Sequence, residues 1–244
     1  MFGNKVIMDA LSEYRFKTEL HCHSFPASGC GDFSPEETVK IYSDLGYDAI
    51  VLTNHFHRGQ LLKGESDAEY IRRYTDDYLR AYAEGDRLGV KVIFGMELRF
   101  TDNSNDYLVY GVDEIGSAEL FLHLSGNLAE FRRDYKNDGM ILIQAHPCRH
   151  GCVRAEPELL DGVEVFNLHP FHNGAIGFAA KFAHETKGII TSGSDFHHPG
   201  TAGLGGIYTK TLPSDTHELT EILRSGDYLL DIGGIPAIPD FMRR

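Results

Sequence analysis

The sequence predicts an α/β fold in a single domain spanning residues 1–244, with a parallel sheet or barrel whose strands are joined by helical crossovers. Three observations lead to this expectation. Short apolar runs alternate with helical segments, which is typical of βαβ units. No linker, internal repeat or low-complexity tract divides the chain. Histidines and acids stand where the predicted strands end, and barrels of this kind place their chemistry there.

The first predicted strand covers Phe16–His23 and ends in a His-x-His pair. Side chains alternate between the two faces of a strand, so His21 and His23 point in the same direction. Two imidazoles on a rigid strand suit a divalent transition metal that prefers nitrogen ligands. The alternative interpretation is a pair of ordinary, half-buried histidines. The residues at the ends of the other predicted strands decide between a metal site and ordinary histidines.

The next helix opens with a capping box, in which Ser34 is the N-cap and Glu37 stands three residues later. This helix is expected to run to about Leu45. The apolar run Tyr47–Thr53 then predicts a buried strand that delivers His55 at its end.

A long helix is predicted over Ala68–Leu88, after a charged loop. Its four tyrosines recur at intervals of four, which indicates packing against the core rather than a cofactor site. Val90–Met96 is the following apolar strand, and Glu97 comes directly after it. The tyrosines are Tyr70, Tyr74, Tyr78 and Tyr82.

The second half of the chain continues the alternation. A polar turn ends at Asp106, and the segment Ser117–Tyr135 is expected to form one or two helices broken near Gly126. The other predicted strands are Tyr107–Val112, Met140–Ala145, Val163–Asn167, Ile189–Ser192 and Leu204–Thr211, and the other helices cover Ala175–Lys187 and the stretch from a Ser214 cap to about Gly226.

Charge and composition limit the classes of molecule that the protein is expected to bind. The formal net charge of −13 disfavours a long nucleic acid, whose phosphates the surface would repel. A small anion is still compatible, because bound divalent cations invert the local field. No apolar run is long enough to span a membrane, and residues 1–5 lack the core of a signal peptide, so a cytoplasmic location is expected. The sequence leaves the oligomeric state open.

The four cysteines are Cys22, Cys30, Cys148 and Cys152, and they form no CxxC pair. We expect reduced thiols rather than a disulfide framework. A metal-binding role for the pair Cys148 and Cys152 is the alternative, although two cysteines three residues apart are not a four-ligand set.

Six stretches, taken together and in order, resemble the PHP (polymerase and histidinol phosphatase) family. The resemblance implies a distorted seven-stranded (β/α) barrel with two or three divalent metals (Zn, Mn or Fe). It implies that His21, His23, Glu97 and Asp195 hold one metal, that Glu97 bridges to a second metal shared with His146, and that His55 and His197 reach the remaining positions. The stretches are Glu19–Ser24, Thr53–His55, Gly95–Glu97, Gln144–Pro147, Gly162–Asn167 and Ser192–His197.

Three positions depart from the family pattern or extend it. Asn54 replaces the usual aspartate before the histidine at 55, so a charged orienting group becomes neutral. Asp106 stands where the family often has a histidine, and an aspartate can still ligate through a harder oxygen. Asp32 is the candidate for a further ligand in the loop after the first strand, with a solvated loop acid as the alternative.

The function implied is hydrolysis of a phosphoester, most simply the phosphomonoester of a small metabolite, with metal-bound hydroxide as the nucleophile. Asp195 and His197 are the expected catalytic ligands. Arg149 is expected to grip the phosphate, unless it is a surface arginine paired with Glu156. The alternatives are a metal-dependent amidohydrolase, a nuclease acting on nucleic-acid ends and a metal-binding regulatory domain. His57, Arg58 and His198 are weaker substrate-side candidates, whereas His123, His169, His172, His184 and His217 are assigned to structure or surface.

Overall fold

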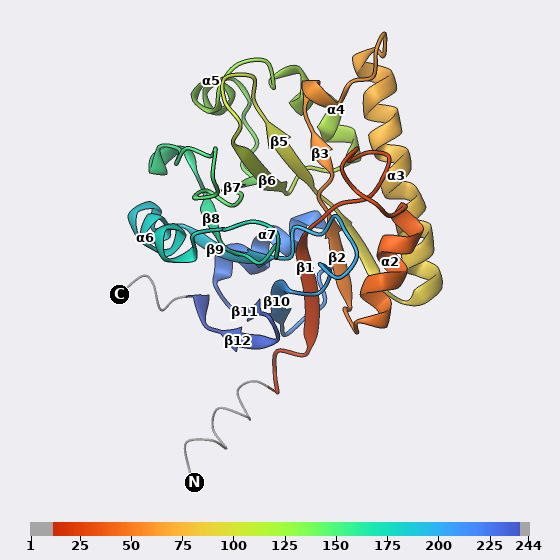
Figure 1. Ribbon diagram of the computed structural model, residues 1–244, viewed down its shortest axis with the longest axis vertical. Coiled ribbons are helices and arrows are strands. Elements are labelled where there is room, and N and C mark those ends of the chain that lie inside the picture. Colours follow the sequence, from red (N-terminus) through yellow and green to blue (C-terminus); the bar gives the residue numbers. More distant parts are fainter. Residues whose placement is uncertain (1–11, 240–244) are drawn as a thin grey trace.

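The computed structural model describes residues 12–239, which form an α/β fold of two mixed sheets with helices on the outside (Figure 1). The strand order is β12-β11-β10-β1-β2-β4 in the first sheet and β3-β5-β6-β7-β8-β9 in the second, with six strands in each. The predicted fold class is confirmed at this level. The expectation for residues 1–5 lies outside the described residues.

The elements have the following bounds. The first sheet contains β1 (Phe16–Cys22), β2 (Ala49–Leu52), β4 (Lys91–Phe94), β10 (Gly205–Thr209), β11 (Leu229–Ile232) and β12 (Ile235–Ala237). The second sheet contains β3 (His55–Phe56), β5 (Met96–Arg99), β6 (Asp106–Tyr110), β7 (Ile141–Gln144), β8 (Gly162–Asn167) and β9 (Ile189–Gly193). The helices are α2 (Pro35–Asp44), α3 (Asp67–Leu88), α4 (Glu114–Leu122), α5 (Leu128–Asp134), α6 (Ile176–Thr186) and α7 (Thr216–Ser225), with short 3₁₀ turns at Arg58–Gln60 and Pro157–Leu159.

The two sheets adjoin at two places. Hydrogen bonding continues from β2 and β4 into β3 and β5, because the Glu97 amide donates to the Asn54 carbonyl at 3.0 Å. On the other side, Phe196 just beyond β9 bridges to Cys22 of β1. The carboxyl end of β1 therefore lies between the two sheets.

The sheets are mixed, which corrects the expectation of a parallel sheet. β5 pairs antiparallel with β6, and β6 with β7. The turn between Arg99 and Asp106 is too short for a helical crossover, so the chain makes a hairpin instead. The C-terminal strands β11 and β12 were also not predicted; they extend the first sheet as an antiparallel meander.

The helices confirm most of the caps and breaks that the sequence predicts. Ser34 and Glu37 form the predicted capping box of α2, and the segment near Gly126 does separate two helices, α4 and α5. The cap of α7 is Asp215 rather than Ser214; its carboxylate accepts from two backbone amides of the first turn. Three of the four stripe tyrosines, Tyr70, Tyr74 and Tyr78, are buried, as packing against the core requires.

All four cysteines are free thiols, as expected. In the part of the chain from residue 12 to residue 239, none of the helices combines the length and apolar character that crossing a membrane would require.

Candidate metal centre

The end of β1 aims two buried imidazoles at one point, as the alternation of the strand predicts. The side chains of His21 and His23 are fully buried. Their Nε2 atoms lie 3.3 and 3.5 Å from Oδ1 of Asp195, which follows β9. β1 and β9 can approach this closely because residue 193 is glycine: a Cβ there would lie 2.6 Å from the Cβ of His21.

Glu97 of β5 stands at the centre of the cluster. Its carboxylate lies 3.2 Å from Nε2 of His21, 2.7 Å from Nδ1 of His55 and 3.2 Å from Nε2 of His146. Register explains this convergence, since β3 and β5 pair in parallel with His55 directly beside Glu97. One carboxylate therefore contacts imidazoles from three different strand ends.

Four groups of ligand atoms lie close enough to hold metal ions, with every atom of a group within 4.8 Å of the others. His21, His23, His55 and Glu97 each belong to two of these groups, and of these four only the carboxylate of Glu97 has two oxygens with which it could bridge two metals. The groups are His21 with His23 and Asp195; His21 with Glu97 and His146; His23 with His55 and His197; and His55 with Glu97 and Asp106.

Hydrogen bonds made by the outer nitrogens of two imidazoles determine which nitrogen of each ring is left to bind a cation. Nδ1 of His21 donates to Glu164 at 2.9 Å, and Nδ1 of His197 donates to the Asp195 carbonyl at 2.9 Å. Nε2 of His21 has no hydrogen-bond partner among the described residues, although it is buried. This nitrogen lies 3.2 Å from the Glu97 carboxylate and 3.3 Å from that of Asp195, and such a buried arrangement requires a proton or a cation between the nitrogen and the oxygens. The donor set therefore fits divalent metals.

Ser28 fixes the orientation of His23 in the same way. The Ser28 hydroxyl donates to Asn54 at 2.8 Å, so toward Nδ1 of His23, 3.0 Å away, it acts as an acceptor. That leaves Nε2 of His23 unprotonated and turned inward. Asn54, the neutral replacement for aspartate, thus orients His23, and it does so through Ser28.

Electrostatics shows how tightly these groups are coupled. Burial would lower the pKa of His55, but the Glu97 carboxylate outweighs it and raises this pKa to about 10. Burial opposes ionisation of Glu97, yet His21 and His55 hold the pKa of that carboxyl well below its usual range. For His23, burial and the neighbouring imidazole of His197 lower the pKa well below its usual value. The set thus pairs carboxylates with imidazoles in a site removed from water.

Two of the candidate ligands have strained backbones. His146 has φ of 31° and Asp195 has φ of 51°, and both values lie in the left-handed region that non-glycine residues rarely adopt. Glu164 stabilises the backbone conformation of His146, because its carboxylate accepts a hydrogen bond from the His146 amide at 3.0 Å. Strain of this kind persists where the surroundings enforce it, and it concentrates at functional sites.

Two further candidate metal ligands, Asp106 and Asp32, lie in different surroundings. Asp106 is buried at the edge of the cluster, 3.8 Å from Nε2 of His146, but both of its oxygens also accept from Arg99 at 2.7 Å. Asp32 is 53% exposed and contacts His198 at 2.9 Å, and it belongs to none of the ligand groups found among residues 12–239. The geometry does not support Asp32 as a ligand.

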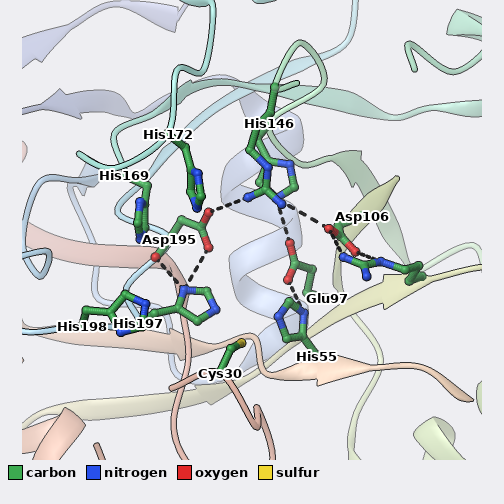
Figure 2. Close-up of a pocket in the computed structure, with 12 residues that line it drawn as sticks. Cys30, His55, Glu97, Asp106, His146, His169, His172, Asp195, His197 and His198 are labelled. Carbon is green, nitrogen blue, oxygen red and sulfur yellow. Dashed lines mark hydrogen bonds and ion pairs between the residues drawn. The ribbon is translucent and has the colours of Figure 1, made fainter. Parts of the chain in front are cut away.

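A pocket of about 200 Å³ opens above the cluster (Figure 2). The guanidinium of Arg149 stands in its wall, 3.7 Å from Asp195, so among the described residues its carboxylate partner is Asp195 and not Glu156. Arg58 pairs instead with Asp67 at 3.1 Å. The pocket is lined by Cys30, His55, Glu97, Arg99, Asp106, His146, Arg149, His169, His172, Asp195, His197 and His198.

Sequence reasoning missed four of these lining residues. The sequence pattern assigns His169 and His172 to structure or surface and gives Arg99 no role. His169 follows β8 by two residues, so the strand-end rule that selected the other histidines could have found it. Cys30 was treated only as a reduced thiol. Burial opposes its ionisation, but hydrogen bonds with His197 and His55 lower the pKa of Cys30 to about 6.

Asp195→Asn should remove bound metal while the fold is retained. The amide keeps the size of the carboxylate, and asparagine tolerates positive φ, but the charge facing His21 and His23 disappears. We expect metal affinity to fall by more than about 100-fold, beyond the effect typical of an outer-shell partner. Metal content after desalting measures this, with circular dichroism as the test of folding. The exposed Asp134→Asn, which loses only a pair with Arg133, is the matched control.

The comparisons with known proteins agree with this architecture. The model of the PHP domain family matches residues 19–172, more than half of the chain. No curated protein matches the chain. A two-domain protein from Bacteroides vulgatus ATCC 8482, which contains a predicted PHP-like metal-dependent phosphoesterase, is 17% identical with a TM-score of 0.66; the match covers 91% of this chain and 66% of that one, just under two thirds.

Two further structures share the fold. A predicted metal-dependent phosphoesterase from Bifidobacterium adolescentis ATCC 15703 is 16% identical with a TM-score of 0.52, covering 85% of this chain and 96% of that chain. PsfC from Pseudomonas syringae PB-5123 is 15% identical with a TM-score of 0.55, covering 83% of this chain and 86% of that chain. The extent of the family match, from the strand of His21 and His23 through the residues behind β8, shows that this chain belongs to the PHP domain family.

Proposed function

We propose that the protein is a metal-dependent phosphoesterase that hydrolyses a small phosphomonoester. The observation that carries this proposal is the pocket itself: its floor is the cluster around Glu97 and Asp195, and its wall presents the guanidinium of Arg149. A volume of about 200 Å³ suits a phosphoryl group with part of a small metabolite. The net charge of −13 further disfavours a polymeric nucleic acid.

The chemistry divides between the metals and the protein. When bound, divalent metals lower the pKa of a coordinated water to about 7 and so supply a nucleophile at neutral pH. Arg149 supplies a planar donor fork that matches two phosphate oxygens. Its side chain is 26% exposed, so it can reach substrate without first leaving a buried site. The imidazoles of His169 and His172 line the same pocket and add hydrogen-bond donors toward an anion.

The names of two structural neighbours support the same reaction class, since both are described as predicted metal-dependent phosphoesterases. We further propose that the metals number two or three, drawn from zinc, manganese and iron, with the four ligand groups around Glu97 as their sites. Glu97, which belongs to two of these groups, is the carboxylate that two bound metals would share.

At the level of the fold, we propose that residues 1–244 form a single domain and that the two sheets make a distorted seven-stranded barrel. The supports are the strands that continue from one sheet into the other and the bridge between Cys22 and Phe196 on the opposite side. The core cluster of the described residues includes side chains from both sheets, which also favours one domain.

A panel of phosphorylated metabolites, assayed with the metal-loaded protein, tests the proposed function. We expect release of inorganic phosphate from at least one small phosphomonoester and no release from the chelator-treated protein. Assays for ammonia and amines on unphosphorylated substrates run in parallel. If the metal-loaded protein freed ammonia or an amine and liberated no phosphate from any ester, the amidohydrolase alternative would replace this proposal.

Arg149→Ala should weaken the enzyme without removing metal. The substitution deletes a charged donor to the phosphate but no atom of the ligand groups. Loss of a charge-assisted hydrogen bond costs about 1.5–3 kcal/mol, so kcat/KM should fall by about 10- to 100-fold. Arg154→Ala, in the same segment but paired on the surface with Glu185, is the control. Unchanged kcat/KM in the Arg149 variant would remove this residue from the substrate site.

A further inference from the structure

Three imidazoles form one of the ligand groups of the metal centre without a carboxylate. The ligand nitrogens of His23, His55 and His197 all lie within 4.8 Å of one another. The rings of His23 and His197 stack with centroids 4.0 Å apart. Nε2 of His23 is fully buried and has no hydrogen-bond partner among the described residues. This group contains no carboxylate of its own, so a cation bound there would have only neutral ligands.

The loop after β1 is the segment placed to supply the missing anionic ligand. The backbone amide of Asp32 donates to the carbonyl of His197 at 2.9 Å, which ties this loop to the ligand segment. The Asp32 carboxylate, however, turns outward to His198. It does not line the pocket.

Cys30, two residues earlier, does line the pocket. Its side chain faces the imidazoles of both His55 and His197. Figure 2 shows the sulfur pointing between these two rings. Of the loop's two candidate anionic ligands, Cys30 is thus the one whose side chain enters the pocket. Like Asp32, it belongs to none of the groups whose ligand atoms lie within 4.8 Å of one another, so its sulfur must move toward the three nitrogens to bind the same ion.

We propose that Cys30 would be a thiolate ligand of a metal ion bound by His23, His55 and His197. The inference rests on the metal centre of the proposed function and adds a sulfur ligand to it. On coordination the thiol loses its proton to solvent and a sulfur–metal bond forms, with no change of oxidation state. A thiolate favours zinc, iron or cobalt over manganese and magnesium at this position.

Cobalt(II) provides a direct test, because a thiolate ligand gives a charge-transfer band in the near ultraviolet that nitrogen and oxygen ligands do not. The full chain is stripped with a chelator, reloaded with cobalt(II) and examined for total cobalt, visible cobalt bands and the near-ultraviolet band. The variants are Cys30→Ser, Cys30→His and the control Cys148→Ser, a half-buried thiol outside the pocket.

We expect the near-ultraviolet band in the wild type and in Cys148→Ser, and its loss in Cys30→Ser together with weaker cobalt binding. Cys30→His should restore cobalt binding without the band. A band that persists in Cys30→Ser would assign the thiolate elsewhere, with Cys152 near His146 the first suspect, and would overturn the proposal. Cobalt bound to the wild type without any such band would overturn it as well. A wild type that binds no cobalt would refute the metal centre itself and this inference with it.

Alkylation of the unmodified protein gives a second measurement that needs no variant. Iodoacetamide should modify Cys30 in the metal-free protein, and zinc should protect it by at least about 10-fold in rate, because only the free thiolate reacts. Peptide mapping distinguishes Cys30 from Cys148 and Cys152. Equal rates with and without bound zinc would contradict the proposal.

Discussion

Removing the metals with a chelator should abolish phosphate release and lower the melting temperature of the protein. A ligand present at 100 times its dissociation constant stabilises the folded state by about 2.7 kcal/mol. For a chain of 150–250 residues, each kcal/mol corresponds to about 2–4 °C, so the melting temperature should fall by about 5–10 °C. Differential scanning calorimetry of the loaded and stripped protein measures this, and readdition of zinc or manganese should restore both properties.

The size of this effect should depend on pH. In the metal-free protein, the Cys152 thiol and Glu97 outweigh the burial of His146 and raise its pKa to about 10, and the pKa of His55 is likewise about 10. A raised pKa contributes stability that is complete below the unfolded value of about 6.5 and is lost as the pH rises through about 10. Metal must displace the same protons, so its affinity increases over this range.

The difference in melting temperature between loaded and stripped protein should therefore be larger near pH 9 than near pH 6.5. Two effects add in this direction: the stripped protein loses the ion pairs of His55 and His146 with Glu97, and the loaded protein binds its metals more tightly. A difference that is constant with pH, or that shrinks toward pH 9, would mean that these imidazoles are not the groups from which metal displaces protons.

The ends of the strands were predictable from the sequence, because an apolar run and the polar residues that directly follow it are local signals. His21, His23, His55, Glu97, His146, Asp195 and His197 were selected in this way, together with the family resemblance, and the structure brings all seven into the ligand groups. Their convergence depends on strand order and register, which local patterns do not contain. Glu97 illustrates this point, since the expected strand ended at Met96, whereas β5 continues to Arg99 and pairs Glu97 with His55.

The loop after β1 was harder to predict, because the outcome there depends on which way each side chain turns. The family resemblance made Asp32 the candidate for a further ligand in this loop, but the loop places Cys30 in the pocket and Asp32 at the surface. The backbone of this loop contacts His197 through the amide of Asp32, and this contact joins segments 165 residues apart, which local sequence patterns do not contain. The mixed sheets have a similar origin, because a hairpin and a crossover differ in connection length rather than in strand pattern.

Glu97→Gln should have the largest effect of any single substitution in the site. The glutamine side chain is isosteric, but it replaces a charged acceptor with an amide whose NH₂ group would point a donor at an imidazole or a metal. The carboxylate lies within 3.2 Å of nitrogens from His21, His55 and His146, so all three lose their shared counter-charge together. Breaking a buried pair by removing one partner costs about 3–5 kcal/mol.

We expect Glu97→Gln to lose more than one metal equivalent, because Glu97 belongs to two ligand groups, and to release phosphate more than about 100-fold more slowly than the wild type. Asp195→Asn should lose fewer equivalents, because Asp195 belongs to one group. Elemental analysis and initial rates at saturating metal separate the two variants, and the exposed Glu185→Gln is the control. Full metal content in Glu97→Gln would rule out a bridging carboxylate, since a neutral amide cannot neutralise two divalent ions held on either side of it.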